Sequence, residues 1–140
     1  MAKETLNPSE LFPSLQYGFS QIVTSTGGKT VFMSGQVAWD REQRIIGPGD
    51  LGTQTRQALR NVETAVQAAG GSLADVTSMR IYFVEKQLQE IHHISEALKE
   101  FFLSEWAPAT TWVGVRTLAN REFLIEIEAV AVVELAPSLP

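Results

Sequence analysis

The spacing of hydrophobic residues changes several times along the chain, and each change predicts a new secondary-structure element. Five segments are rich in β-branched and aromatic residues and are predicted to be strands: residues 17–24, 30–36, 76–84, 110–115 and 122–135. Two other segments, 51–69 and 88–102, repeat their apolar residues every three or four positions, which predicts helices with one buried face. The predicted order is strand, strand, helix, strand, helix, strand, strand.

Glycine and aspartate residues mark the boundaries of these elements. The pair Gly27-Gly28 separates the first two strands so closely that we expect them to form a hairpin. Asp50 is placed to cap the first helix with its carboxylate, and Gly70-Gly71 to end it. Residues 37–50, which hold several turn-forming residues, are predicted to be a loop.

The two ends of the chain differ in composition from the segments between them. Residues 1–14 are polar and contain two prolines, and residues 136–140 read APSLP, so we expect a flexible N-terminal segment and a C-terminal tail. Residues 15–135 are then predicted to form a single domain, which fits the length of 140 residues. The mixture of strands and helices predicts an α+β fold, with two helices on one face of a mixed sheet.

The last predicted strand has one apolar face and one mixed face, because alternate side chains of a strand point to opposite sides. Its odd-numbered residues from Phe123 to Val133 are apolar and are expected to meet the helices. Its even-numbered residues combine aliphatic and acidic types: Leu124, Glu126, Glu128, Val130, Val132 and Glu134. We expect Trp112 of the preceding strand to add to this mixed face. Such a face predicts a homo-oligomer whose sheets face one another, the alternative being a monomer with a solvated apolar face.

Composition argues against several classes of function. Eleven Lys and Arg against 16 Asp and Glu give a formal net charge of −5, which disfavours a protein held on nucleic-acid phosphates. The absence of cysteine excludes disulfides, thiolate metal sites and a cysteine nucleophile. No apolar run is long enough for a signal peptide or a membrane span, so we expect a cytoplasmic protein with no membrane partner.

The two histidines of the chain, His92 and His93, are adjacent in the second predicted helix. Neighbouring side chains on a helix point about 100° apart, so we do not expect this pair to hold one metal ion in the manner of histidines four residues apart. Both are interpreted as surface residues, and no metal site is predicted.

Seven segments of the chain carry a family resemblance through their sequence, order and spacing: FSQIV at 19–23, VFMSGQVAWD at 31–40, TRQALRNVETAVQAAGGSLADV at 55–76, RIYFV at 80–84, EFF at 100–102, PATTWVGV at 108–115 and IEIEAVAVV at 125–133. Together they resemble the RidA/YjgF family, also called the L-PSP or enamine/imine deaminase family. The resemblance implies a chorismate-mutase-like α+β fold. It also implies a homotrimer with a central β-barrel and ligand clefts between neighbouring subunits.

In catalytically competent members of this family, the cleft hydrolyses short-lived enamines and imines and releases ammonia. The resemblance places the carboxylate that handles water at Glu126. It places an aromatic residue of the first strand at Phe19, a turn at Ser34 and Gly35, and a polar position of the second helix at Ser95. No metal or organic cofactor is expected, because the carbon of an imine is already electrophilic.

One position departs from the family pattern. Thr110 occupies the place of an arginine that clamps the carboxylate of the substrate, a task for which a planar guanidinium is suited. Arg116 is no evident substitute, since six residues along a strand span about 20 Å. The small anionic substrate 2-aminoacrylate is therefore not expected. Trp112, two residues further on, adds an aromatic surface that would suit a flatter, larger or less anionic ligand.

Two functions remain open at this point. The first is a hydrolytic deaminase in which Glu126 delivers water, Thr110 and backbone N–H groups near Gly35 orient the ligand, and Phe19 and Trp112 wall it. The second is a non-catalytic small-molecule-binding or regulatory trimer that has kept the cleft and lost the chemistry. An endoribonuclease, a third activity associated with the family, is disfavoured by the net negative charge.

Overall fold

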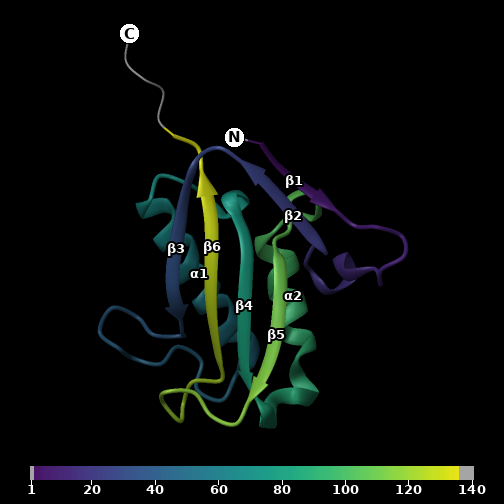
Figure 1. The fold of residues 1–140 in the computed structure, drawn as a ribbon. Helices are drawn as coiled ribbons and strands as arrows, with labels where there is room; N and C mark the ends of the chain where they lie inside the picture. Colours follow the sequence, from purple (N-terminus) through teal and green to yellow (C-terminus); the bar gives the residue numbers. More distant parts are fainter. Residues whose placement is uncertain (1, 136–140) are drawn as a thin grey trace.

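The computed structural model describes residues 2–135, so the predicted tail at 136–140 lies outside the described residues. The described part contains these helices and strands, shown in Figure 1: β1 (Ala2–Leu6), β2 (Ile22–Thr26), β3 (Lys29–Gln36), α1 (Leu51–Ala68), β4 (Val76–Val84), α2 (His92–Phe101), β5 (Ala109–Val115) and β6 (Ile125–Val133). Short 3-10 helices cover Ser14–Tyr17, Leu73–Asp75, Glu85–Glu90 and Ser104–Trp106.

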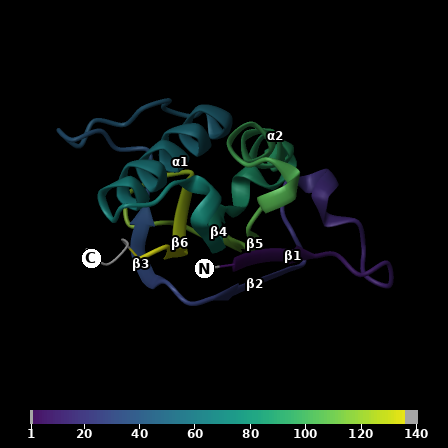
Figure 2. The same cartoon turned by 90° about the horizontal axis from the view of Figure 1, so that it is seen from above.

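Strands β3, β6, β4 and β5 form the main sheet, in that order. The central strand β6 runs antiparallel to both of its neighbours, whereas β4 and β5 are parallel. Helices α1 and α2 lie side by side on one face of this sheet, as Figure 2 shows from above. The predicted α+β fold, a mixed sheet with two helices on one face, is therefore confirmed.

The core lies between the helices and the sheet. Every second residue of β6, from Ile125 to Val133, is buried, while the residues between them are partly exposed. The buried residues meet fully buried side chains such as Leu59 of α1 and Leu98 of α2. From Ile125 onward the period of two in the sequence thus assigns the two faces of β6 correctly, and the even-numbered residues face away from the helices. Leu124, expected on the mixed face, lies before β6 and is buried in the core, so that part of the prediction is wrong.

The predicted hairpin between the first two strands is wrong. Strand β2 pairs antiparallel with β1, and β3 pairs with β6 instead. Residues 14–17 form a 3-10 turn that ends at Gly18, whose φ of 97° is left-handed, so the strand begins only at Ile22. The β1–β2 pair lies across the sheet on the side opposite the helices, next to β4 (Figure 2). Strand β2 therefore pairs with β1 in place of β3, the partner predicted for it. The polar sequence of β1 did not indicate a strand.

Lys3 explains why this N-terminal segment forms a strand. Its ammonium group donates hydrogen bonds to the carbonyl oxygens of Ala74, Val76 and Trp106, at 2.7, 2.8 and 2.7 Å. Burial lowers the pKa of Lys3 to about 8. All three ammonium hydrogens are used, so the contact ties β1 to segments more than 70 residues away. Part of the segment predicted to be flexible is thus held to the rest of the domain.

Buried Gln54 of α1 connects the helix to two loops and to the entry of β6. Its side-chain amide donates to the carbonyl oxygens of Gly47 and Glu122 at 3.1 and 3.0 Å. Its side-chain oxygen accepts a hydrogen bond from the backbone N–H of Leu124 at 2.9 Å. The Gln54 side chain is 0% exposed. Its hydrogen bond from the Leu124 N–H is buried, and its two bonds to carbonyl oxygens are partly buried.

Arg56 of α1 and Glu100 of α2 form a bidentate ion pair, at 2.9 and 2.7 Å. These hydrogen bonds lower the pKa of Glu100 below its ordinary value. A carboxyl group whose pKa is lower in the folded state contributes stability above its unfolded pKa, and this contribution disappears as the pH falls through the folded pKa. We expect Glu100→Gln to lower the melting temperature slightly at pH 7, and the difference to shrink as the pH falls through the lowered pKa of Glu100. Thermal unfolding of both proteins at a series of decreasing pH values checks the expectation; a difference that does not shrink with falling pH contradicts it.

Candidate functional site

Glu126 and Gly35 lie against each other on the two neighbouring strands β6 and β3. The pairing of these strands shifts register between Met33 and Gln36, so Ser34 and Gly35 form an irregular step in β3. The carboxylate of Glu126 occupies the space beside Gly35, where a Cβ atom would overlap it. The absence of a side chain at residue 35 makes room for the acid in this position, and a larger residue there would displace the Glu126 carboxylate. Ser34 is exposed beside this contact.

A depression of about 670 Å³ opens beside this contact. Gly35 and Glu126 line one side of it, and residues of α1 and of the loop after β3 line the other, among them Asn61 and Trp39. The Trp39 ring packs edge-on against Phe123, with 4.8 Å between ring centroids. Trp39 therefore packs the loop against the residues that lead into β6.

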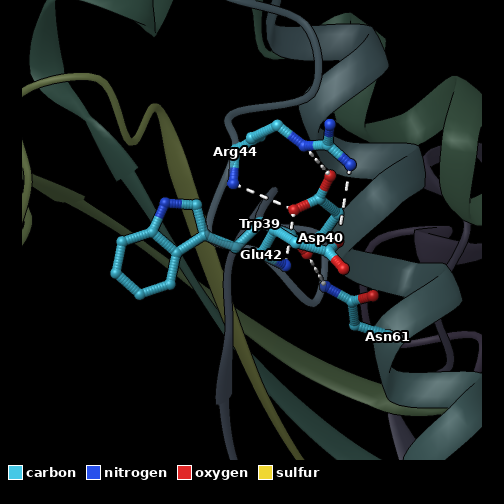
Figure 3. A network of polar contacts seen from close by, with 5 residues as sticks. All are labelled: Trp39, Asp40, Glu42, Arg44 and Asn61. Carbon is cyan, nitrogen blue, oxygen red and sulfur yellow. Dashed lines mark hydrogen bonds and ion pairs between the residues drawn. The ribbon is translucent and has the colours of Figure 1, made fainter.

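The wall formed by this loop is fixed by a polar network, shown in Figure 3. Asn61 of α1 donates from its side-chain amide to the carbonyl oxygens of Val37 and Trp39, at 2.9 and 3.1 Å. Asp40 accepts hydrogen bonds from the backbone N–H groups of Glu42 and Arg44 and from the Arg44 guanidinium. These contacts, led by the Arg44 backbone N–H, lower the pKa of Asp40. The loop beside Glu126 is therefore held to α1 in a defined shape.

Thr110 and Trp112 lie on the other face of the sheet from Glu126. Trp112 is opposite Ile81 in the β4–β5 pairing, and Ile81 is opposite Ile127 in the β4–β6 pairing. Ile81 and Ile127 are buried under the helices, so Trp112 also faces the helices. The expectation that Trp112 adds to the mixed face is thus wrong. Alternation fixes faces within one strand, whereas the faces of two strands are related only by their register.

Trp112 is the centre of a second group of the predicted residues. Its indole N–H donates to the Thr110 hydroxyl oxygen at 2.9 Å, and its ring meets that of Phe19 at a centroid distance of 6.0 Å. Ser95 of α2, 8% exposed, lines with Trp112 and Tyr17 a depression of about 320 Å³. We call this depression the Trp112 pocket; it is lined by Gln16, Tyr17, Ile91, His92, Ser95, Glu96, Lys99 and Trp112.

The predicted site residues are therefore brought together as two groups within one chain. Gly35 and Glu126, with Ser34 adjacent, form the Glu126 group on β3 and β6. The other four form the Trp112 group near β5 and α2: Phe19, Ser95, Thr110 and Trp112. The two groups lie on opposite faces of the sheet, so a single chain does not join them into one site.

Tyr82 and Arg80 of β4 are additional residues of the face that carries Glu126. Tyr82 lies opposite Glu126, and its hydroxyl donates to a Glu128 carboxylate oxygen at 2.6 Å. This hydrogen bond raises the pKa of Tyr82, because the neighbouring carboxylate favours the protonated phenol. Arg80 lies 3.8 Å from the same carboxylate. Alternation in residues 76–84 could have identified both, since the even-numbered positions from Ser78 to Tyr82 face away from the helices.

The two acids of β6 thus have different surroundings. Glu128 is engaged by Tyr82 and Arg80, whereas no hydrogen bond or ion pair engages the Glu126 carboxylate within residues 2–135. Glu126 is partly exposed. A carboxylate that is accessible and not engaged by protein donors can accept a proton from a water molecule, so Glu126 is the better candidate for a general base.

The expectation that the two histidines point apart is also wrong. The ring centroids of His92 and His93 are 4.1 Å apart, and Glu90 lies beside them. His92 is the first residue of α2, where no preceding turn of the same helix constrains the direction of its side chain.

Among the described residues, no helix is both long and apolar enough to span a membrane.

Comparison with known proteins identifies the family of this chain. The sequence model of the family described as Endoribonuclease L-PSP matches residues 12–133. A RutC family protein of Pyrococcus horikoshii is 36% identical over 113 residues, 81% of this chain and 85% of that protein. A protein of Dermatophagoides farinae named 2-iminobutanoate/2-iminopropanoate deaminase is 31% identical over 107 residues, 76% of this chain and 80% of that protein.

Solved structures show the same fold. The Rid family protein YyfB of Yersinia pestis is 35% identical and superposes with a TM-score of 0.89, covering 95% of this chain and all of that one. TdcF of E. coli, solved with bound serine, is 32% identical with a TM-score of 0.65, covering 84% and 94% of the two chains. The chain belongs to the L-PSP family, also called RidA/YjgF, and the resemblance noted in the sequence is confirmed.

Proposed function

We propose that the protein is a hydrolytic deaminase of reactive enamines and imines. Its site would be a cleft between subunits, where the Glu126 group of one subunit meets the Trp112 group of the next. The observation that carries the proposal is the division of the predicted site residues between two faces of the sheet, since association of copies can join groups that one chain keeps apart. The name of the related deaminase from Dermatophagoides farinae supports the reaction class.

The exposed apolar residues of the sheet support association into a homotrimer. Phe32 of β3 lies opposite Val130 of β6, on the face that carries Glu126, and is 79% exposed. Val113 of β5, on the same face as Tyr82, is 38% exposed. Covering such side chains by another copy removes apolar surface from water and so favours assembly.

The chemistry requires a base and an oriented substrate. Glu126 accepts a proton from a water molecule while the oxygen of that water forms a bond to the imine carbon. The electron pair of the C=N bond moves to the nitrogen, which takes up a proton. As the C–N bond of the resulting carbinolamine breaks, the hydroxyl group gives up its proton and the departing nitrogen takes up a proton, which leaves a carbonyl compound and ammonia. Backbone N–H groups near Gly35 and the Thr110 hydroxyl would orient the substrate.

The Trp112 group determines which substrates fit. The Thr110 oxygen accepts the hydrogen bond of the Trp112 indole, so its own O–H remains free to donate to a ligand. Lys99 brings a positive charge to the pocket and Glu96, one turn earlier, a negative one. Aromatic walls and balanced charge favour imines with larger or aromatic side chains over a three-carbon acid.

The test is an assay with imines generated in place by an amino-acid oxidase, followed by ammonia release or by loss of semicarbazone formation. We expect the purified protein to accelerate hydrolysis of imines from aromatic amino acids more than of those from alanine or serine. The opposite order of preference would contradict the role given to the Trp112 group.

A substitution at Thr110 tests the missing arginine separately. Thr110→Arg is expected to raise activity on small anionic imines, because the guanidinium can bind their carboxylate in a bidentate manner. Thr117→Arg is the matched control, since it makes the same change at an exposed threonine beyond the end of β5. Equal gains in both variants would show that general charge, and not the position of Thr110, determines the effect.

A non-catalytic binding or regulatory trimer is the second candidate. The observation that favours it is Thr110, which gives the pocket no guanidinium with which to hold a carboxylate. In that case no imine of a broad amino-acid panel would be hydrolysed faster, while a small molecule would remain bound through native purification.

A further inference from the structure

We propose that Glu90, His92 and His93 form a binding site for a divalent transition-metal ion such as Zn²⁺. They lie where the 3-10 helix Glu85–Glu90 joins α2. One ligand atom from each residue, a ring nitrogen or a carboxylate oxygen, lies within 4.8 Å of the other two. Two imidazoles and one carboxylate are a ligand set that Zn²⁺ accepts, with further positions left for water.

The surroundings of His93 match those of a metal-bound histidine. Its Nε2 atom is 3.3 Å from a carboxylate oxygen of Glu90, and its Nδ1 atom is 3.5 Å from one of Glu96. If Nε2 binds the metal beside Glu90, then Nδ1 carries the proton and faces the carboxylate of Glu96. Metal-binding histidines commonly direct their second nitrogen to a carboxylate in this way, which orients the ring and raises its affinity.

The charge around the cluster also favours a cation. Glu90, Glu96 and Asp50 bring three carboxylates, and Asp50 lines with Glu90 and His93 a surface depression of about 480 Å³. The Arg56 guanidinium acts on Asp50 and Glu96 and offsets part of this charge, and a divalent ion would offset the remainder. Glu90 and His92 are exposed, so an ion can enter from solvent. His92 and Glu96 also line the Trp112 pocket, so the ion would lie at the edge of that pocket.

Metal titration of the tag-free protein tests the site. The full sequence has two histidines and no cysteine, so any imidazole–metal signal reports on this cluster alone. We expect calorimetry with Zn²⁺ to give one ion per chain, and Co²⁺ to give the visible absorption of a nitrogen-ligated ion. His93→Ala and His92→Ala are each expected to weaken Zn²⁺ binding by more than about 100-fold, and Glu96→Gln by about 10-fold.

Glu85→Gln is the matched control, because Glu85 lies in the same 3-10 helix and is exposed, but is not part of the cluster. It is expected to leave Zn²⁺ affinity unchanged. The proposal is overturned if neither ion binds at millimolar concentration, or if Zn²⁺ binds equally well to the histidine variants. These readouts do not depend on imine hydrolysis, so they stand or fall separately from the proposed function.

Discussion

Replacing Glu126 by glutamine is expected to lower the rate of imine hydrolysis at least about 100-fold, because the amide cannot accept the proton of the attacking water. Glutamine keeps nearly the same shape, so the contact with Gly35 is preserved and folding should be unaffected. The measurement is the rate of ammonia release at saturating substrate, with circular dichroism and solution mass to verify fold and assembly.

Glu128→Gln is the control for this substitution. It removes the same charge from the same face of β6, but from an acid already engaged by Tyr82 and Arg80. We expect the variant to keep most of the activity. If the Glu128 variant loses as much activity as the Glu126 variant, general charge on this face, and not Glu126 as a base, determines the rate.

Mixed oligomers test whether two subunits share the site. Trp112→Ala should also be weakly active, because it removes a wall of the other half of the cleft. In oligomers refolded from equal amounts of the Glu126 and Trp112 variants, about a quarter of the clefts combine two intact halves and should recover activity. No recovery, or a solution mass equal to one chain, would show that the two groups do not meet in the proposed cleft.

Gln54→Leu is expected to destabilise the protein by about 2–6 kcal/mol, the largest effect on stability that we predict. Leucine leaves the buried Leu124 N–H without a partner, at a cost of about 1–3 kcal/mol, and removes two partly buried hydrogen bonds to carbonyl oxygens, each worth about 0.5–1.5 kcal/mol. Urea unfolding followed by tryptophan fluorescence gives the difference in the free energy of unfolding.

Gln67→Leu makes the same chemical change at an exposed position of α1. Its cost should stay within about 0.5 kcal/mol. If the two variants were equally stable, the hydrogen bonds of Gln54 would contribute little to the free energy of unfolding.

The helices and the main sheet could be predicted because their signals are local. Strand β4 has the predicted range of 76–84, and α1 ends one residue before the predicted 69. Asp50 caps α1 as expected, its carboxylate accepting the Thr53 N–H at 3.0 Å. The second helix is shorter than predicted, because residues 85–90 form a 3-10 helix in which Leu88 is 54% exposed.

The pairing of β2 could not be predicted, because it depends on contacts that are distant in the sequence. Gly27-Gly28 is a good hairpin signal, and both residues adopt the left-handed conformation. The partner of β2 is decided instead by β1, which Lys3 anchors to carbonyl oxygens at residues 74, 76 and 106. A lysine in a polar segment gives no sign of such a contact.

The site was predicted only in part for a similar reason. Gly35 and Glu126 were assigned to the same cleft and do lie together, whereas Trp112 was assigned to the wrong face. The error comes from the register between β4 and β5, which no single strand encodes. Alternation within β4 could have placed Tyr82 on this face, but its position opposite Glu126 depends on the register between β4 and β6.

The contact between Gly35 and Glu126 links the evolution of two positions that are 91 residues apart in the chain. A side chain at 35 would push the Glu126 carboxylate out of its present position, so the two positions constrain each other. Descendants of this sequence that lose the glycine at 35 should therefore tend to carry a shorter residue at 126. Such covariation would mark lineages that have abandoned the acid, and with it the base of the proposed reaction.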